Sequence, residues 1–471
     1  MSIRVQYGNA IVVALLISAA CRTQNVTLQH VPVIASTVVA VKPIKPIALP
    51  RDPSDSLYKR LVDCPSVVHF YRERNFSTAW FDSLRHPTAK ADSMMSIIRN
   101  ARYFGLLPGR YHLNELDQLK DSRKSPYPER TEVLLTDAFL RLANDLRRGV
   151  SMVHEGADSV SVDLLHSALR EGEIVSALNS VEPGYSQYKA LKHAIQEILD
   201  STNASTKGRI LSGEISDVEP TMKMLQAVEV NLERWRVEKH FMEAGRYVRI
   251  NIPSFMLHVM SDGKPVLESR IIVGTQETPT PAFNSMVECF TLYPYWYVPR
   301  KISVEEFLPI IQHDTSFVTR NNFDVLDRQG RVLRADSIDW MTFNKNNFPV
   351  SLRQREGEGN SLGIIKFVFD NPYAVFLHDT NAKALFKRQV RMFSHGCIRM
   401  EKAFEMAHYL LTNDPSKRSA ALDKYLAKQE RRTVNLPSPV PIYIHYFTCE
   451  VVNGRLYRYE DVYDRDERLR E

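Results

Sequence analysis

The sequence contains little cysteine, with five in 471 residues. That number is too small for the disulfide framework of small secreted domains. Dense blocks of lysine and arginine are also missing and the net charge is only +6, so nucleic acid is not an expected partner. We find no repeat of fixed period. With 44% hydrophobic and 25% charged residues, the chain is typical of a globular protein of two or three domains.

The first 56 residues predict an export signal followed by a tether. The apolar run IVVALLISAA at 11–20 is too short to span a bilayer and is typical of a signal-peptide core. Cys21 follows it in a context that resembles a bacterial lipoprotein cleavage site, although Ser18 stands where leucine is usual. We therefore expect residues 1–21 to be a signal peptide or lipoprotein signal, with lipidation of Cys21 or cleavage nearby as alternatives. Residues 22–56 are rich in proline and should form a semi-extended, flexible tether.

Residues 57–240 show the apolar periodicity of helices. The segment TEVLLTDAFLRLANDLRRG, at 131–149, places Leu135, Phe139 and Leu142 on one face and ends at a glycine. Segments 90–108 and 221–236 follow the same pattern. Nothing in this region brings reactive side chain types together. We expect a helical scaffold domain over 57–240.

At Gly245 the pattern changes to the two-residue alternation that is typical of strands. Asp262-Gly263 and Asn453-Gly454 are hairpin-turn signals. Further strand-like runs are ECFTLYPYWYVP (288–299), GIIKFVFDNPYAVFLHD (363–379) and the run from 439 to 463. The predicted fold class is α+β, with the helical scaffold followed by a mainly β domain over 241–466. Residues 301–362 mix helix and polar loop and are predicted to be an inserted lid.

The stretch FSHGCIRM, at 393–400, carries the clearest chemistry. A cysteine attacks only as the thiolate, and an ordinary thiol with a pKa of about 8.5 needs a base or a cation to activate it. His378 stands at the end of an apolar run, and a returning chain can bring it against Cys397 as the general base. His395 is the rival base. Arg399 shares a face with Cys397 in an extended segment, where its charge would favour the thiolate or bind a substrate carboxylate.

Two backbone features would complete such a site. Gly396 permits a tight turn and a close approach to substrate, and the N–H groups of Gly396 and Cys397 could hold the oxyanion of a tetrahedral intermediate. The tautomer of His378 would be fixed by Asp379 or by a backbone carbonyl.

A metal site made of His378, His395, Cys397 and His445 is an alternative on ligand type. No second cysteine lies at metal-ligand spacing, and Arg399 would place a positive charge beside the ion, so neither a metal nor another cofactor is expected. A purely structural role for Cys397 is disfavoured by its polar neighbours. Cys289 and Cys449 lie in strand-like segments and could pair, although a disulfide is not expected.

The stretch HDTNAKALFKRQVRMFSHGCIRM resembles the signature of the L,D-transpeptidase family with its YkuD-type catalytic domain: a histidine, a gap, then Ser/Thr-His-Gly-Cys and a following Arg or Asn. The resemblance is strong over 221–466 and weaker over 57–220. Further segments resemble the large YcbB-type subgroup: INIPSFMLHV, VGTQETPTPAF, YPYWYVPRKI, NSLGIIKFVFDNPYAVFLHDT and YEDVYDRD. The insertion at 301–362 resembles the capping subdomain of that subgroup.

The resemblance implies a periplasmic enzyme that forms 3→3 cross-links in peptidoglycan, acts on cell wall and cell shape, and is acylated by carbapenems. Its partners would be a donor tetrapeptide stem and a diaminopimelate acceptor, and a monomer is expected. The implied roles are nucleophile for Cys397, base for His378, oxyanion site for Gly396 and its neighbours, and loop support for Ser394 and Arg399. The implied substrate-binding residues are Tyr295, Trp296, Asn371, Asp379 and Thr380, with an aromatic core role as the alternative for Tyr295 and Trp296.

Several positions depart from the family pattern. Phe376 stands where tyrosine is common, Asn381 replaces a common proline, and Tyr297 replaces a common asparagine. Residues 200–220 are too short for the peptidoglycan-binding module of many relatives. Two other functions remain open: an L,D-carboxypeptidase that uses water as the acceptor, and a non-catalytic wall-binding scaffold.

Overall fold

The computed structural model describes residues 47–121, 128–151, 156–212, 220–243, 245–412 and 418–469. The predicted export signal with Cys21, and residues 22–46 of the predicted tether, lie outside the described residues. The end of the tether prediction is wrong, because Leu49 is buried in the core of the helical part. Within these ranges, no helix has the length and apolar character needed to cross a membrane.

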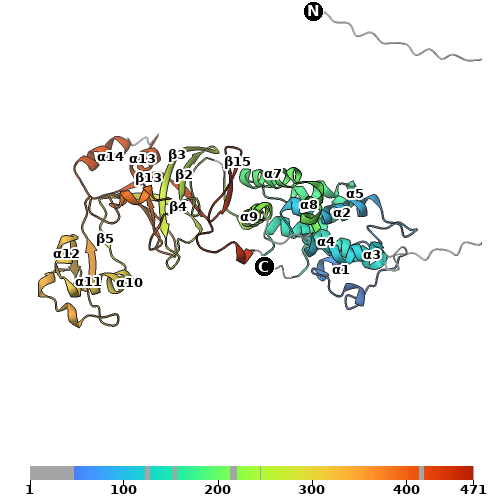
Figure 1. The fold of residues 1–471 in the computed structure, drawn as a ribbon, viewed down its shortest axis with the longest axis horizontal. Coiled ribbons are helices and arrows are strands. Elements are labelled where there is room, and N and C mark those ends of the chain that lie inside the picture. Colours follow the sequence, from blue (N-terminus) through green and yellow to red (C-terminus); the bar gives the residue numbers. More distant parts are fainter. Residues whose placement is uncertain are drawn as a thin grey trace, which may run out of the picture. The chain divides into compact units, whose positions relative to one another are not determined.

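The N-terminal part of the described chain is helical (Figure 1). Its α-helices are α1 (Cys64–Glu73), α2 (Ala89–Arg99), α3 (Leu113–Asp121), α4 (Pro128–Arg148), α5 (Ser159–Glu171), α6 (Ile174–Ser180), α7 (Ser186–Ser201), α8 (Ala204–Ser212) and α9 (Pro220–Val237). Short 3₁₀ turns lie at Ser56–Tyr58, Ala101–Phe104 and Pro108–Tyr111.

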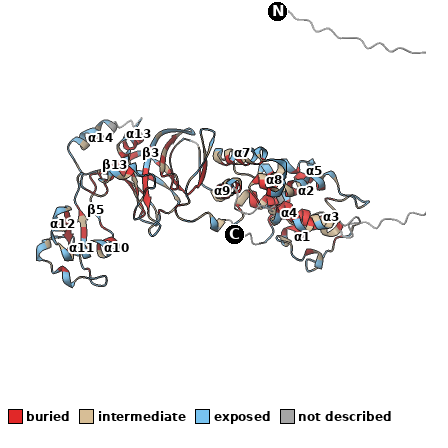
Figure 2. Ribbon diagram, viewed as in Figure 1, coloured by how far each residue is buried: buried red, intermediate tan, exposed pale blue. Residues whose placement is uncertain are grey.

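The helices form where the periodicity predicts them, and they bury the predicted faces. Leu135, Phe139 and Leu142 of α4 are almost completely buried, and Figure 2 shows buried residues concentrated inside the helical group. The side chain of Asp63 accepts a hydrogen bond from the first turn of α1, which satisfies a free N–H at the helix start. Gly149 follows α4 with a φ of 88°, a conformation that suits glycine beyond a helix end.

The catalytic candidate residues lie in a sheet of nine strands, counted over the described residues. The strand order is β11-β3-β12-β10-β9-β4-β13-β1-β2, and an additional pairing of β2 with β3 closes the sheet on itself. The strands are β1 (Arg246–Asn251), β2 (Met256–Ser261), β3 (Lys264–Gly274), β4 (Phe283–Leu292), β9 (Ile365–Phe369), β10 (Leu377–His378), β11 (Met392–Ser394), β12 (Ile398–Met400) and β13 (Arg432–His445). Helices α13 (Ala403–Leu410) and α14 (Arg418–Ala427) come between β12 and β13.

The strands form where apolar residues alternate with more polar ones, because this places the apolar side chains on the face that is buried. Val248 and Ile250 of β1, Phe367 of β9 and Ile442 of β13 are fully buried and belong to one apolar core. The helical part and this sheet together confirm the predicted α+β class. The predicted turn at Asn453-Gly454 joins β14 (Cys449–Val452) to β15 (Arg455–Arg458).

The segment between β4 and β9 has a sheet and a core of its own. Its strands are β5 (Trp296–Tyr297), β6 (Phe323–Leu326), β7 (Val332–Leu333) and β8 (Ser351–Gln354), and its helices are α10 (Arg300–Ile302), a π-turn at Ser303–Phe307, α11 (Leu308–His313) and α12 (Ser316–Arg320). Trp340 and Leu352 are central to this core.

The run ECFTLYPYWYVP is therefore not one strand. Tyr293 has a φ of 47° and Pro294 cannot donate to a ladder, so β4 ends at Leu292. Trp296 then pairs with Gln354 in the sheet of the insertion.

Helix α9 packs against the C-terminal part of the chain. The ring of Trp235 stacks on Phe447, with centroids 4.4 Å apart. The amide of Asn231 accepts a hydrogen bond from the N–H of Thr448. The helix thus contacts the segment that follows β13.

Candidate functional site

Two adjacent parallel strands bring Cys397 and His378 to the same face of the sheet. In the pairing of β10 with β12, Leu377 lies opposite Ile398 and His378 lies opposite Arg399. Leu377 and Ile398 are fully buried in the apolar core. Because side chains alternate along a strand, His378, Arg399 and Cys397 share the opposite face. Cys397 and His378 are diagonal neighbours on it.

His378 is held as a neutral imidazole. Its Nδ1 lies 2.5 Å from the carbonyl oxygen of Asp379. A carbonyl can only accept, so Nδ1 carries the proton and Nε2 has the free lone pair. Burial lowers the pKa of His378 to about 3, and the nearby charges of Arg399 and Lys366 act in the same direction. The imidazole is therefore neutral at neutral pH, with the lone pair on Nε2.

Cys397 is partly exposed and rests as a thiol. Burial raises the pKa of this thiol above its usual value, while the N–H of Phe376 and the charges of Lys366 and Arg399 act to lower it. Because the raising effect is the larger, forming the thiolate requires a base. His378 meets that requirement in protonation state and in strand position.

Two cations flank the thiol. The Nζ of Lys366 lies 3.4 Å from the centroid of the Phe376 ring, and β9 pairs Lys366 with His378. Burial lowers the pKa of Lys366 and of Arg399. Among the ion pairs of the described residues, neither cation has a carboxylate partner. The site therefore suits a substrate that carries carboxylates.

The loop from Ser394 to Cys397 is hydrogen bonded within itself. Gly396 has a φ of 106°, which only glycine adopts without strain. The hydroxyl of Ser394 donates to the carbonyl of Cys397 at 2.5 Å and accepts the N–H of Gly396 at 3.2 Å. The Gly396 amide is thus engaged in the loop, and its part in an oxyanion site stays a prediction.

His395 contacts the insertion. Its Nε2 lies 2.7 Å from a carboxylate oxygen of Glu306, in the π-turn at Ser303–Phe307. The rival base is therefore paired with a carboxylate, and it joins the cysteine loop to the inserted segment.

Three of the predicted substrate-binding residues bind neighbouring backbone. The Asp379 carboxylate accepts the N–H of Ile364 at 3.0 Å and pairs with Lys383. Asn371 makes four hydrogen bonds to the backbone of its own turn. The buried hydroxyl of Thr380 accepts the N–H of Ala382. These contacts shape the turns on both sides of His378, and it is the backbone carbonyl of Asp379 that fixes the imidazole tautomer.

The residues of the alternative metal site are not gathered together. His445 lies on β13, with its Nε2 3.2 Å from a carboxylate oxygen of Glu238. Over the described ranges, no group of three or more His, Cys, Asp or Glu side chains is arranged to hold a metal ion. Cys289 and Cys449 are free thiols, as are Cys64 and Cys397.

Two family models match the chain. One, described as a scaffold domain, covers 65–195, and the other, described as an L,D-transpeptidase catalytic domain of the YkuD type, covers 245–417. The second range includes β10, β12 and the cysteine loop. The chain carries a YkuD-type L,D-transpeptidase catalytic domain. Its combination with the scaffold domain fits the YcbB-type architecture.

A Haemophilus influenzae protein named "Putative L,D-transpeptidase" is 33% identical over 253 residues, which are 53% of this chain. The match spans about half (50%) of the length of that relative. The solved "Structure of the Ldtfm-avibactam carbamoyl enzyme" aligns with 49% of this chain and 64% of its own at 13% identity, with a TM-score of 0.20. At this identity and TM-score, the match supports no conclusion about this chain.

Tyr295 and Trp296 lie where the chain enters the insertion. Trp296 lies 6.0 Å from Phe307 and 6.2 Å from Phe323, between ring centroids, which fits the alternative of an aromatic core role. The ring of Tyr295 contacts the guanidinium groups of Arg353 and Arg431, at 4.4 Å and 4.8 Å from its centroid. Substrate contact by Tyr295 and Trp296 stays a prediction.

Lys366 is a residue of the candidate site that sequence reasoning missed. The signal was present, because a lysine interrupts the apolar run IIKFVF at a position that alternates with buried residues. Its significance depends on which strands flank β9, and the pairing of β9 with β10 supplies that information.

Proposed function

We propose that this chain is a peptidoglycan L,D-transpeptidase that forms 3→3 cross-links through a thioester on Cys397 and releases D-alanine. The observation that carries the proposal is the pairing of β10 with β12, which sets a neutral His378 beside Cys397 on one face. The family match over 245–417 supports the same chemistry.

In the first half-reaction, Nε2 of His378 takes the thiol proton as the sulfur attacks the carbonyl carbon between the L- and D-centres of a tetrapeptide stem. A tetrahedral oxyanion forms. When it collapses, the C–N bond breaks and the departing D-alanine amine takes the proton from His378. Cys397 keeps the acyl group as a thioester.

In the second half-reaction, the side-chain amine of diaminopimelate on another stem attacks the thioester. His378 accepts a proton from this amine and returns it to the sulfur as the C–S bond breaks. The products are a 3→3 amide and the free thiol. With water as the nucleophile, the same thioester would give a tripeptide, which is the carboxypeptidase alternative.

The charges around the thiol support a stem peptide as the substrate. Stem peptides carry free carboxylates, and Lys366 and Arg399 are desolvated cations without carboxylate partners among the described residues. A substrate carboxylate would supply the missing countercharge. Because this substrate lies outside the cytoplasmic membrane, export of the chain to the periplasm, anchored through Cys21 or free, is part of the proposal.

The deciding experiment incubates the purified protein with disaccharide-tetrapeptide and follows the products by mass spectrometry. We expect a cross-linked dimer that has lost one D-alanine. Cys397→Ala should abolish the reaction because it removes the nucleophile. Cys449→Ala is the matched control, because Cys449 lies in β14, and it should keep most activity.

Each other outcome points to a different function. Tripeptide without dimer would identify a carboxypeptidase, and turnover by Cys397→Ala would refute the assigned nucleophile. No product from a folded protein that still binds peptidoglycan would favour the non-catalytic scaffold. Carbapenems should add one drug mass to the wild-type chain and none to Cys397→Ala.

A further inference from the structure

Two motifs with no part in the mechanism meet beside the cysteine loop. VGTQETPTPAF covers 273–283 and YEDVYDRD covers 459–466. The hydroxyl of Tyr463 donates to the carbonyl of Gly274 at 2.7 Å and accepts the N–H of Thr280 at 3.2 Å. One tyrosine thus holds both ends of the turn that follows β3.

The same turn contacts the residue before the nucleophile. Thr280 is completely buried. Its hydroxyl accepts the N–H of Gly274 at 2.9 Å and donates to the carbonyl of Gly396 at 2.8 Å. Both hydrogen-bonding functions of this hydroxyl are therefore used, and one of them acts directly on the cysteine loop.

The turn has little space in which to move. A Cβ at Gly274 would lie 2.0 Å from the carbonyl oxygen of Thr278 and 3.1 Å from the nitrogen of Gly396. The carbonyl of Ser394 accepts the N–H of Thr275 at 3.0 Å and the hydroxyl of Thr278 at 3.3 Å. The turn and the cysteine loop therefore pack as one unit.

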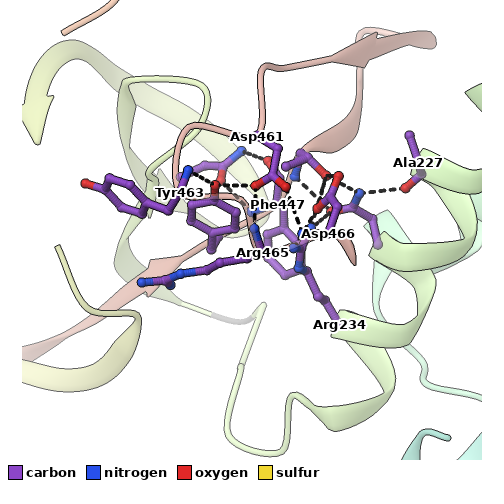
Figure 3. Close-up of polar contacts among 11 residues, drawn as sticks. Ala227, Arg234, Phe447, Asp461, Tyr463, Arg465 and Asp466 are labelled. Carbon is purple, nitrogen blue, oxygen red and sulfur yellow. Dashed lines mark hydrogen bonds and ion pairs between the residues drawn. The ribbon is translucent and has the colours of Figure 1, made fainter. Parts of the chain in front are cut away.

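The other end of this contact is anchored in the C-terminal segment. The Asp461 carboxylate accepts the N–H groups of Arg465 and Asp466 and the hydroxyl of Tyr446, so it closes the turn that presents Tyr463 (Figure 3). The N–H of Tyr463 donates to the hydroxyl of Tyr446 at 2.8 Å. Tyr463 is consequently fixed in position.

Helix α9 is part of the same network. The guanidinium of Arg234 forms an ion pair with Asp466 at 2.7 Å and donates to the hydroxyl of Thr448 at 3.0 Å (Figure 3). A continuous path of polar contacts therefore leads from α9 through the 461–466 turn to Gly396.

We propose that Thr280 and Tyr463 are positioning residues that aim the backbone N–H of Cys397 at the oxyanion of the acyl-transfer reaction. The C=O of Gly396 and the N–H of Cys397 belong to one planar trans peptide unit and point in opposite directions. Fixing the carbonyl through Thr280 therefore fixes the direction of the amide. Tyr463 holds Thr280 in place. This inference rests on the proposed function, because the oxyanion arises in that reaction.

The first test compares Thr280→Val with Thr280→Ser in the full chain. Valine keeps the shape but leaves the carbonyl of Gly396 without its donor, and we expect kcat to fall roughly tenfold or more with little change in KM. Serine restores the hydroxyl and should return kcat to within about threefold of the wild type. A purely structural role would not separate kcat from KM in this way.

The second test replaces Tyr463 by phenylalanine, which removes the hydroxyl that holds the turn. We expect a smaller fall in kcat, roughly threefold, because Tyr463 acts through Thr280. Tyr111→Phe is the control: it also removes one phenolic hydroxyl, from a fully buried tyrosine whose hydroxyl donates to Asp145 in the helical part. This variant should leave kcat unchanged.

Amide hydrogen exchange of the peptide that covers 393–400 can be measured without a wall substrate. It therefore tests the positioning role of Thr280 and Tyr463 separately from the proposed transpeptidase function. Thr280→Val and Tyr463→Phe should speed exchange in this peptide, and Tyr111→Phe should not. If the wild type forms no product, the proposed function fails, and exchange still decides whether Thr280 and Tyr463 hold the loop. Unchanged exchange and unchanged kcat in folded variants would overturn the inference. Should Thr280→Val not fold, Thr280→Ser and Tyr463→Phe decide by the same measurements.

Discussion

Cys397 and His378 could be named from the sequence as candidates for nucleophile and base, and the pairing of β10 with β12 places them on one face of the sheet. Their register could not be assigned, since β10 and β12 are only two and three residues long and one slip would turn His378 into the core. The engagement of the Gly396 amide by Ser394 was equally hidden, because it depends on a rotamer in a loop.

Lys366 gives a prediction at this scale. Its ammonium lowers the pKa of the Cys397 thiol, so Lys366→Met should shift the pH profile of Cys397 alkylation to higher pH and slow the reaction at neutrality. Lys366→Arg keeps the charge and should shift the profile less. The measurement is the rate of iodoacetamide labelling, followed on the peptide that contains Cys397.

Lys189→Met is the control for this experiment, because Lys189 is exposed in α7 and should not alter the profile. A wild-type profile in Lys366→Met would mean that the ammonium does not act on the thiol.

Among the elements, helices and long strands were predictable from periodicity, whereas the short strands around the site were not. The run ECFTLYPYWYVP has the composition of one strand, yet a left-handed Tyr293 and Pro294 divide it between two sheets. Composition indicates that residues can form a strand, but it does not indicate with which strands they pair.

The end of β3 supplies an element-scale prediction. In Gly274→Ala the new Cβ would meet the backbone oxygen of Thr278 at 2.0 Å, and backbone cannot move aside as a flexible side chain can. We expect a loss of about 2 kcal/mol or more in the free energy of unfolding, measured by urea denaturation.

Gly109→Ala is the matched control, since nothing lies within 4 Å of a Cβ built at Gly109. It should change the free energy of unfolding by less than about 0.5 kcal/mol. Equal effects of the two substitutions would contradict the close packing at Gly274.

The whole molecule brings together segments that no local pattern connects. Residues 274–280, the cysteine loop and the 461–466 turn meet although Gly274 and Tyr463 are 189 positions apart. The motifs at 273–283 and 459–466 could be noted as similar to a family, but their contact follows from the closure of the sheet and the packing of α9, which are tertiary facts.

A whole-molecule prediction concerns acid stability. Burial lowers the pKa of His258 from its usual 6.5 to about 4, so the folded state binds fewer protons than the unfolded state between these values. The stability contributed by neutral His258 is complete above about pH 6.5 and is lost as the pH falls toward 4. His378, with a pKa of about 3, acts with the same sign.

The substitution His258→Gln removes one such group. Urea unfolding over this pH range should therefore show a free energy that falls less steeply with acid than in the wild type. A slope identical to that of the wild type would show that His258 titrates alike in both states.

The way the insertion joins the sheet has a consequence for the evolution of the protein. Its first strand, β5, and its last, β8, are antiparallel neighbours, with Trp296 opposite Gln354. The chain therefore leaves the catalytic sheet and returns to it through one short ladder. Because both ends of the insertion lie in one ladder, we expect that its length and surface can change during evolution without moving the strands that carry His378 and the cysteine loop.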